Sequence, residues 1–218
     1  MPSIRLYIFF IAISFLVSLS VYIRPKGVPA YLKFFPPFLL ATLIVEITAV
    51  YITKYGKHNV TLYNFFTTFE FCFYMWILHM LVKNKRVRLI LVSTIPIYAI
   101  AAVYNIIWKQ GMDRFHTVTY SMGCLLIVIF STYYFLELFR LPKSVKLANN
   151  PAFWICSGVL FFYCCGFPLY AFINFWIQFE WVVKSFNDIF NILNIFLYSL
   201  FTISFICVRT RKYTLSLS

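Results

Sequence analysis

Residues 186–206 read FNDIFNILNIFLYSLFTISFI, an apolar run interrupted by only a few polar side chains. Four of these recur at regular steps: Asn187, Asn191, Asn194 and Tyr198. Their spacings of four, three and four residues place them on one face of a helix. A buried amide in hydrocarbon is costly unless it finds a hydrogen-bonding partner, so this face is predicted to look toward protein or water and away from lipid.

The whole chain has the composition of a membrane protein. Of its 218 residues, 62% are hydrophobic and 22% are aromatic, whereas soluble domains are roughly half apolar. Charged residues make up only 11%, yet 19 Lys and Arg against 6 Asp and Glu give a formal net charge of +13. Basic loops between membrane spans set orientation and contact anionic headgroups, so we expect membrane lipid, and not nucleic acid, as the partner of this charge.

Seven apolar stretches come close to the ~20 residues that a helix needs to cross a bilayer. They are residues 4–23, 36–52, 61–82, 89–108, 116–138, 153–175 and 182–208. The predicted fold class is therefore an all-α, polytopic membrane protein with seven transmembrane helices. Residues 1–218 form a single transmembrane domain, of which residues 209–218 are a short basic cytoplasmic tail.

The loop charges predict the orientation, because seven spans place the two termini on opposite sides. Thirteen basic residues share the side of the C-terminus: Arg24, Lys26, Lys33, Lys83, Lys85, Arg86, Arg88, Arg140, Lys143, Lys146, Arg209, Arg211 and Lys212. Six share the side of the N-terminus: Arg5, Lys54, Lys57, Lys109, Arg114 and Lys184. Cytoplasmic loops carry the excess of Lys and Arg, so the N-terminus is predicted outside and the C-terminus in the cytoplasm.

Three acids fall within the predicted spans, in or near the outer half of the membrane: Glu46, Glu70 and Asp188. An ionisable side chain in a membrane is costly, so it indicates a functional site by default. The candidate ligand-binding residues are the acids and the polar residues of the same layer: Glu46, Glu70, Asp188, Asn187, Asn191, Asn194, Asn64 and Tyr198. The alternative is that each acid is protonated and that acids and amides only hydrogen-bond neighbouring helices together.

The chain lacks the residues that several classes of membrane protein need. A retinal protein needs a lysine in the middle of its last helix, but Lys184 lies at the very start of the last span. Sugar transporters of the PQ-loop kind carry Pro-Gln pairs, and the sequence contains none. The three histidines are scattered, and His58 and His116 are expected at or beyond the outer surface. No metal, cofactor or catalytic residue is predicted, and an enzyme is the least favoured class.

Two short motifs carry a family resemblance. Leu62-Tyr63-Asn64 is followed six residues later by Glu70-Phe71, and residues 191–195 read NILNI. With these motifs the chain resembles uncharacterised bacterial seven-helix membrane proteins of about this length. The resemblance implies the architecture, a bacterial inner-membrane location and an association with signalling, and it implies no site residues.

Two functions fit these features. The first is a receptor-like or sensory protein that binds a small ligand or ion in a polar cavity in the outer half of the bundle. Its basic cytoplasmic loops would then contact a signalling partner, because the chain has no effector domain. The alternative is a small secondary transporter or a proton- or cation-conducting protein that uses Glu46, Glu70 and Asp188.

Overall fold

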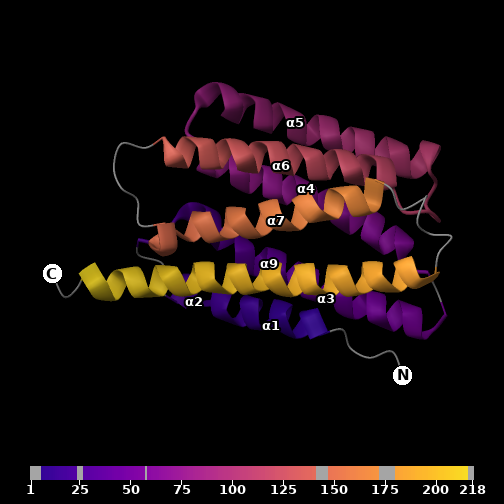
Figure 1. Ribbon diagram of the computed structural model, residues 1–218, viewed down its shortest axis with the longest axis horizontal. Helices are drawn as coiled ribbons and strands as arrows, with labels where there is room; N and C mark the ends of the chain where they lie inside the picture. The colour runs from indigo at the N-terminus through magenta and orange to yellow at the C-terminus, as the bar shows by residue number, and fades with distance from the viewer. Residues whose placement is uncertain (1–5, 24–26, 57, 141–146, 172–179, 216–218) are drawn as a thin grey trace.

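The computed structural model describes residues 6–23, 27–56, 58–140, 147–171 and 180–215 (Figure 1). Side-chain positions are described for these residues except 180–184 and 209–215. Ten basic residues of the charge comparison therefore lie outside the described residues or side chains: Arg5, Arg24, Lys26, Lys57, Lys143, Lys146, Lys184, Arg209, Arg211 and Lys212.

The described residues form helices and turns, with no strand among them. The first four spans correspond to α1 (Leu6–Ser18) with α2 (Ser20–Ile23), η1 (Ala30–Phe34) with α3 (Phe35–Lys54), α4 (Val60–Leu81), and α5 (Lys85–Tyr104) with the π-helical turn η2 (Asn105–Lys109). The remaining helices are α6 (Thr117–Phe139), η3 (Leu147–Asn149), α7 (Pro151–Ala171) and α9 (Glu180–Leu215). The all-helical prediction is thus confirmed.

Six of the described helical segments are long and apolar enough to cross a membrane. They are Leu6–Ile23, Ala30–Lys54, Lys85–Lys109, Thr117–Phe139, Pro151–Ala171 and Ser185–Val208. The third predicted span forms α4, but α4 is not one of the six, because Asn64, Glu70 and His79 interrupt its apolar sequence. At 22 residues, α4 is nevertheless about 33 Å long, enough for a bilayer core of ~30 Å.

The long helices lie side by side in one elongated bundle, with α5 along one edge and α1 and α3 along the other (Figure 1). Helix α9 packs against α7 and α1, α6 packs against α7 and α4, and α4 packs against α5. The last residues of α3, η2 and α7 and the first residues of α9 lie at the same end of the bundle (Figure 1). This is the predicted outer end.

The last helix is longer than predicted. Helix α9 has 36 residues, about 54 Å, so it exceeds the thickness of a bilayer core. Its helical backbone continues through residues 209–215, which the sequence analysis assigns to a separate tail. Basic residues are good helix formers, so a helix already started in the membrane continues into them.

At the predicted cytoplasmic end, hydrogen-bonding side chains cap α5 and α7 and hold the connection between α4 and α5. Asn150 Oδ1 accepts a hydrogen bond from Ala152 N at 3.1 Å and thereby caps α7. Asn84 Oδ1 caps α5 by accepting from Arg86 N at 2.9 Å. Glu137 of α6 accepts from the backbone N–H of Lys83 at 2.8 Å and of Asn84 at 3.0 Å. The basic connection between α4 and α5 is therefore tied to α6.

Candidate functional site

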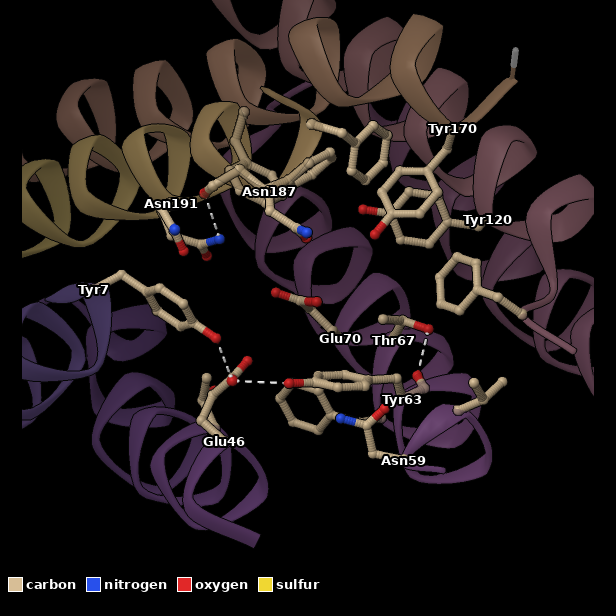
Figure 2. A pocket seen from close by; sticks show the side chains of 18 of the residues that line it. Tyr7, Glu46, Asn59, Tyr63, Thr67, Glu70, Tyr120, Tyr170, Asn187 and Asn191 are labelled. Carbon is tan, nitrogen blue, oxygen red and sulfur yellow. Dashed lines mark hydrogen bonds between the residues drawn. The ribbon is translucent and has the colours of Figure 1, made fainter. Parts of the chain in front are cut away.

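A cavity of about 290 Å³ lies between α1, α3, α4, α7 and α9 in the predicted outer half of the bundle (Figure 2). We call it the carboxylate cavity. Its lining is Tyr7, Thr42, Glu46, Asn59, Val60, Tyr63, Phe66, Thr67, Glu70, Phe115, Tyr120, Phe162, Tyr170, Phe186, Asn187, Phe190, Asn191, Asn194 and Tyr198. It reaches from the first turn of α4 to Tyr198, in the middle of the last apolar run.

Glu46 joins three helices at the cavity. The hydroxyl of Tyr7 from α1 donates to Glu46 Oε2 at 2.5 Å, and the hydroxyl of Tyr63 from α4 donates to the same oxygen at 2.9 Å. Glu46 itself belongs to α3, eight residues before its end at Lys54, and so lies about 12 Å inside the bundle. Both tyrosines and the glutamate line the cavity, so the two hydroxyl groups hold this carboxyl group in place at its edge (Figure 2).

Glu70 occupies the middle of the site. It lies ten residues after the first residue of α4, about 15 Å along the helix and thus near the middle of a ~30 Å hydrocarbon core. Its carboxyl group points into the cavity between Glu46 and Asn187 (Figure 2). It is near enough to Glu46 for the two groups to repel each other when both are charged, and the hydroxyl groups of Tyr74 and Tyr163 lie beside it.

The polar face of α9 lines the same cavity. Asn187, Asn191, Asn194 and Tyr198 all belong to the lining. The structure therefore brings this face together with Glu46 and Glu70, which come from segments more than a hundred residues away. Asn194 Nδ2 donates to the backbone carbonyl of Phe190 at 2.8 Å, which leaves its amide oxygen as the acceptor group of that side chain. Whether these residues bind a ligand stays a prediction.

Two predicted site residues lie elsewhere. Asp188 is exposed and is not among the described residues that line the cavity. One step along a helix turns a side chain by about 100°, so the neighbour of Asn187 faces another direction. Asn64 is fully buried in a separate group of polar residues. Both residues lie at the membrane depth that the sequence analysis assigned to the site, but neither side chain lines the cavity.

Asn64 attaches the loop before α6 to α4. Its Nδ2 donates to the Arg114 carbonyl at 2.8 Å, and its Oδ1 accepts from the His116 backbone N–H at 3.2 Å. The His116 ring contacts Thr67 Oγ1 through Nε2 and Thr119 Oγ1 through Nδ1, each at 2.7 Å. Asn105 and Gln110 bond to Thr119 and Thr117 of α6 and so extend the same network to η2 and the turn after it. We call Asn64, Thr67, Asn105, Gln110, His116 and Thr119 the loop cluster.

The sequence analysis places His116 at or beyond the outer surface, and it does precede α6 at the predicted outer end, but its side chain is not exposed there. The residue is completely buried, because the loop folds back over the bundle end and both ring nitrogens find hydroxyl partners. Removal from water lowers the pKa of the His116 imidazole from 6.5 to about 4. The ring is therefore neutral at physiological pH and has a structural role in the loop cluster.

Apart from Tyr198, the aromatic residues of the cavity were not predicted as site residues. Tyr7, Phe115, Tyr120 and Tyr170 come from four separate segments, and only tertiary packing shows that they meet. A partial signal existed in α4, where Tyr63, Thr67 and Glu70 share a helical face. All three line the cavity.

Packed rings that are not part of the described lining lie beyond Glu70, on the side away from the predicted outer end. We call this layer the aromatic floor: Phe38, Phe73, Tyr74, Tyr163 and Phe201. Phe38 stacks on Phe73 with ring centroids 3.9 Å apart, and Tyr74 lies 5.4 Å from Phe38 and 5.8 Å from Tyr163. Beyond it lies a void of about 10 Å³ that Tyr74 also lines. That volume barely admits one water molecule.

The cavity is lined by acidic, amide, hydroxyl and aromatic side chains. Glu46 and Glu70 are its ionisable carboxyl groups, and no Lys, Arg or His is among its described lining residues. The described residues contain no group of three His, Cys, Asp or Glu side chains that could hold a metal ion. Carboxyl, amide and hydroxyl groups beside aromatic rings are typical of small-molecule pockets.

Comparisons with known proteins do not place the chain in a family: no family model, no curated protein and no solved structure matches it. The resemblance to uncharacterised bacterial seven-helix proteins therefore stays an expectation from two short motifs. Function is inferred below from residues and geometry, because a helical bundle by itself does not specify one.

Proposed function

We propose that the protein is a receptor-like, sensory membrane protein that binds a small ligand in the carboxylate cavity. One observation carries the proposal: two membrane-embedded carboxyl groups and four asparagines from distant segments surround a single cavity of about 290 Å³. Side chains that served only to hold helices together would be packed against each other. Here they line a space large enough for a ligand.

The proposal includes α4 as a seventh spanning helix, an N-terminus outside and a C-terminus in the cytoplasm of a bacterial inner membrane. Two exposed positions test this orientation, Asp113 before α6 and Lys85 at the start of α5. In a cysteine-free background, Asp113→Cys should react with an impermeant thiol reagent added to intact cells. Lys85→Cys should react only after the cells are opened. The opposite pattern would place the cavity on the cytoplasmic side.

The aromatic floor supports sensing over transport. A transporter or channel needs a path from the cavity to the other side of the membrane. The rings of Phe38, Phe73 and Tyr74 pack tightly against one another across the route that such a path would take. A sensor needs only that ligand binding changes helix packing. The alternative, proton or cation transport with Glu46 and Glu70 as carriers, requires these rings to separate during the cycle.

The cytoplasmic output of the sensor is the basic connection between α4 and α5. The side chains of Lys83, Lys85, Arg86 and Arg88 are exposed there. Glu137 holds this connection through two backbone hydrogen bonds, so a shift of α6 would move it. We therefore expect a partner protein with an acidic surface at this position.

One experiment separates the two functions. The purified protein is placed in nanodiscs and its melting temperature is measured against a panel of metabolites, and the same protein in liposomes is assayed for proton and cation flux. A sensor should be stabilised by at least one ligand and should move no ions, with stabilisation lost in Glu70→Gln. Flux that disappears in Glu70→Gln would refute sensing and establish transport.

A further inference from the structure

We infer that the ligand of the carboxylate cavity is a small aromatic compound with an uncharged group that both donates and accepts hydrogen bonds. The inference rests on the proposed binding function and adds the chemical class of the ligand. It depends on three properties of the cavity: its ring surface, its amide groups and its size.

The first property is a set of neighbouring rings along one side of the cavity. We call these six lining residues the aromatic wall: Phe115, Tyr120, Phe162, Tyr170, Phe186 and Phe190. They come from the loop before α6 and from α6, α7 and α9. The ring centroid of Tyr170 lies 4.2 Å from that of Tyr120 and 5.0 Å from that of Phe190. The rings therefore form one continuous surface.

Protein atoms cover the aromatic wall only in part. Phe115, Phe186 and Phe190 are each half-buried, although they contact other rings of the wall and line the cavity. Rings in a packed interior are covered on all sides. Aromatic rings that meet offset or edge to face attract each other beyond the effect of the area they bury. A ligand with a ring therefore completes the packing of this wall better than an aliphatic ligand does.

The second property is a row of amide groups on the face of α9. Asn187 and Asn191 lie one helical turn apart and line the cavity, and neither side chain has a hydrogen bond to the described residues. Asn194 uses its Nδ2 for the Phe190 carbonyl at 2.8 Å, so its Oδ1 remains an acceptor. A polar group away from water is costly without a partner. A primary amide or a hydroxyl group of a ligand supplies both the donor and the acceptor that these uncharged amides need.

The two surfaces lie at different sides of the space. Figure 2 shows the rings of Tyr120 and Tyr170 on one side of the cavity and Asn191 on the other, with Asn187 between them. A molecule that places its ring against the aromatic wall therefore directs its other end toward the amides of α9. This arrangement favours a compound with the ring at one end and the polar group at the other.

The third property is size. The cavity has a volume of about 290 Å³, whereas an apolar protein cavity of ~150 Å³ holds one benzene molecule. The space is therefore sufficient for one ring with a short polar chain, or roughly twice the number of non-hydrogen atoms in benzene. Larger, drug-sized molecules occupy pockets that begin at about this volume and extend to several times it.

The test uses 3-phenylpropanamide, which carries a ring, a short linker and a primary amide. One analogue, 3-cyclohexylpropanamide, has a saturated ring, and the other, 4-phenylbutan-2-one, has a methyl group in place of the amide nitrogen and so lacks a donor. Each compound is titrated by calorimetry against the protein in nanodiscs, and empty nanodiscs measure uptake into lipid. We expect 3-phenylpropanamide to bind and each analogue to bind roughly threefold to tenfold more weakly.

Variants assign the two preferences to the two surfaces. Phe190→Leu should reduce the preference for the phenyl over the cyclohexyl compound, because it removes a ring of the wall. Phe196→Leu is the matched control, since Phe196 also belongs to α9 but is exposed on the outside of the bundle, and it should bind like the wild type. Asn191→Leu should reduce the preference for the amide over the ketone. Each preference is a ratio within one variant, so a modest loss of stability does not affect it.

The possible failures are distinct. If 3-phenylpropanamide binds but either analogue binds equally well, the cavity is a ligand site and the inferred ligand class is wrong. The same conclusion follows if the charged counterparts, 3-phenylpropan-1-amine or 3-phenylpropanoate, bind at least about tenfold more tightly than the amide, or if only a compound without a ring binds from the metabolite panel. If no compound of either set binds to the folded protein, the proposed sensory function is refuted together with the inference.

Discussion

The loop cluster and the carboxylate cavity lie at the same end of the bundle and even share Thr67, yet they use buried polar groups in opposite ways. In the loop cluster, Asn64 and His116 are fully buried, and their side-chain polar atoms bond to threonine hydroxyl groups or to the backbone. In the cavity, Glu46, Glu70 and Asn191 are only partly buried and surround about 290 Å³ of space. The space beside these polar side chains therefore distinguishes the cavity from the structural network of the loop cluster.

The largest expected effect comes from a substitution that disrupts the loop cluster. Asn64→Leu removes the side-chain atoms that bond to the backbone carbonyl of Arg114 and the backbone N–H of His116. It should lower the free energy of unfolding by about 2–4 kcal/mol, since two buried groups lose their hydrogen bonds. The matched change in the cavity, Asn191→Leu, should cost about 1 kcal/mol or less. Denaturation in mixed micelles measures both. Equal losses would remove the distinction between the two regions.

The second effect compares the same substitution at two glycines, one in tightly packed surroundings and one in more open surroundings. A Cβ atom at Gly123 would lie 2.9 Å from the Phe71 ring, so Gly123→Ala should destabilise by about 1–3 kcal/mol through overpacking. At Gly166, beside the cavity, the nearest atom is 3.8 Å away on Phe190. Gly166→Ala should therefore be neutral or stabilise by up to about 1 kcal/mol through better helix propensity. A loss at Gly166 would indicate a cavity more tightly packed than described.

The third effect appears only with pH. The imidazole of His116 has its pKa lowered to about 4 by burial, against 6.5 when exposed to water. Between these values the unfolded chain binds a proton that the native state does not, so the free energy of unfolding should decrease as the pH falls from 6.5 toward 4. In His116→Gln this part of the decrease should be missing. Identical pH profiles of the two proteins would show that the ring takes up its proton without cost.

The smallest effect concerns the hydroxyl groups that hold Glu46. Tyr7→Phe and Tyr63→Phe each remove one donor to Glu46 Oε2. Each should cost about 1 kcal/mol or less, because the other tyrosine hydroxyl group still donates to the same carboxyl oxygen. Ligand affinity should change more than stability. A stability loss as large as that of Asn64→Leu would mean that the Glu46 group is a structural network like the loop cluster.

Much of the fold follows from the sequence because apolar length is a local property. The predicted spans 36–52 and 61–82 differ from α3 and α4 by two residues or fewer at each end. Helix α5 begins at Lys85, four residues before the predicted start, because Asn84 caps it and its basic side chains project into water. Hydropathy alone predicts only the membrane-embedded part of such a helix.

The site could be predicted only in part, because it depends on direction as well as depth. The helical spacing of Asn187, Asn191, Asn194 and Tyr198 identified one lining face correctly, since periodicity encodes direction. Depth alone placed Asp188 in the site, but it is not among the described residues that line the cavity. The contacts of Tyr7 with Glu46 and of His116 with Thr67 join segments 39 and 49 residues apart, and no local pattern encodes them.

The central claim, that Glu70 and the α9 face form an accessible acidic cavity, is tested most directly by the reactivity of a cysteine placed inside it. In a background without the six natural cysteines, Asn191→Cys is treated in nanodiscs with a trimethylammonium methanethiosulfonate and with its sulfonate counterpart. Ile192→Cys, whose side chain is exposed on the outside of the bundle, is the control. The account predicts that the cationic reagent modifies Asn191→Cys at least about tenfold faster than the anionic one, that Glu70→Gln reduces this preference, and that Ile192→Cys shows none. Equal rates at Asn191→Cys, or no reaction until the protein is denatured, would contradict it.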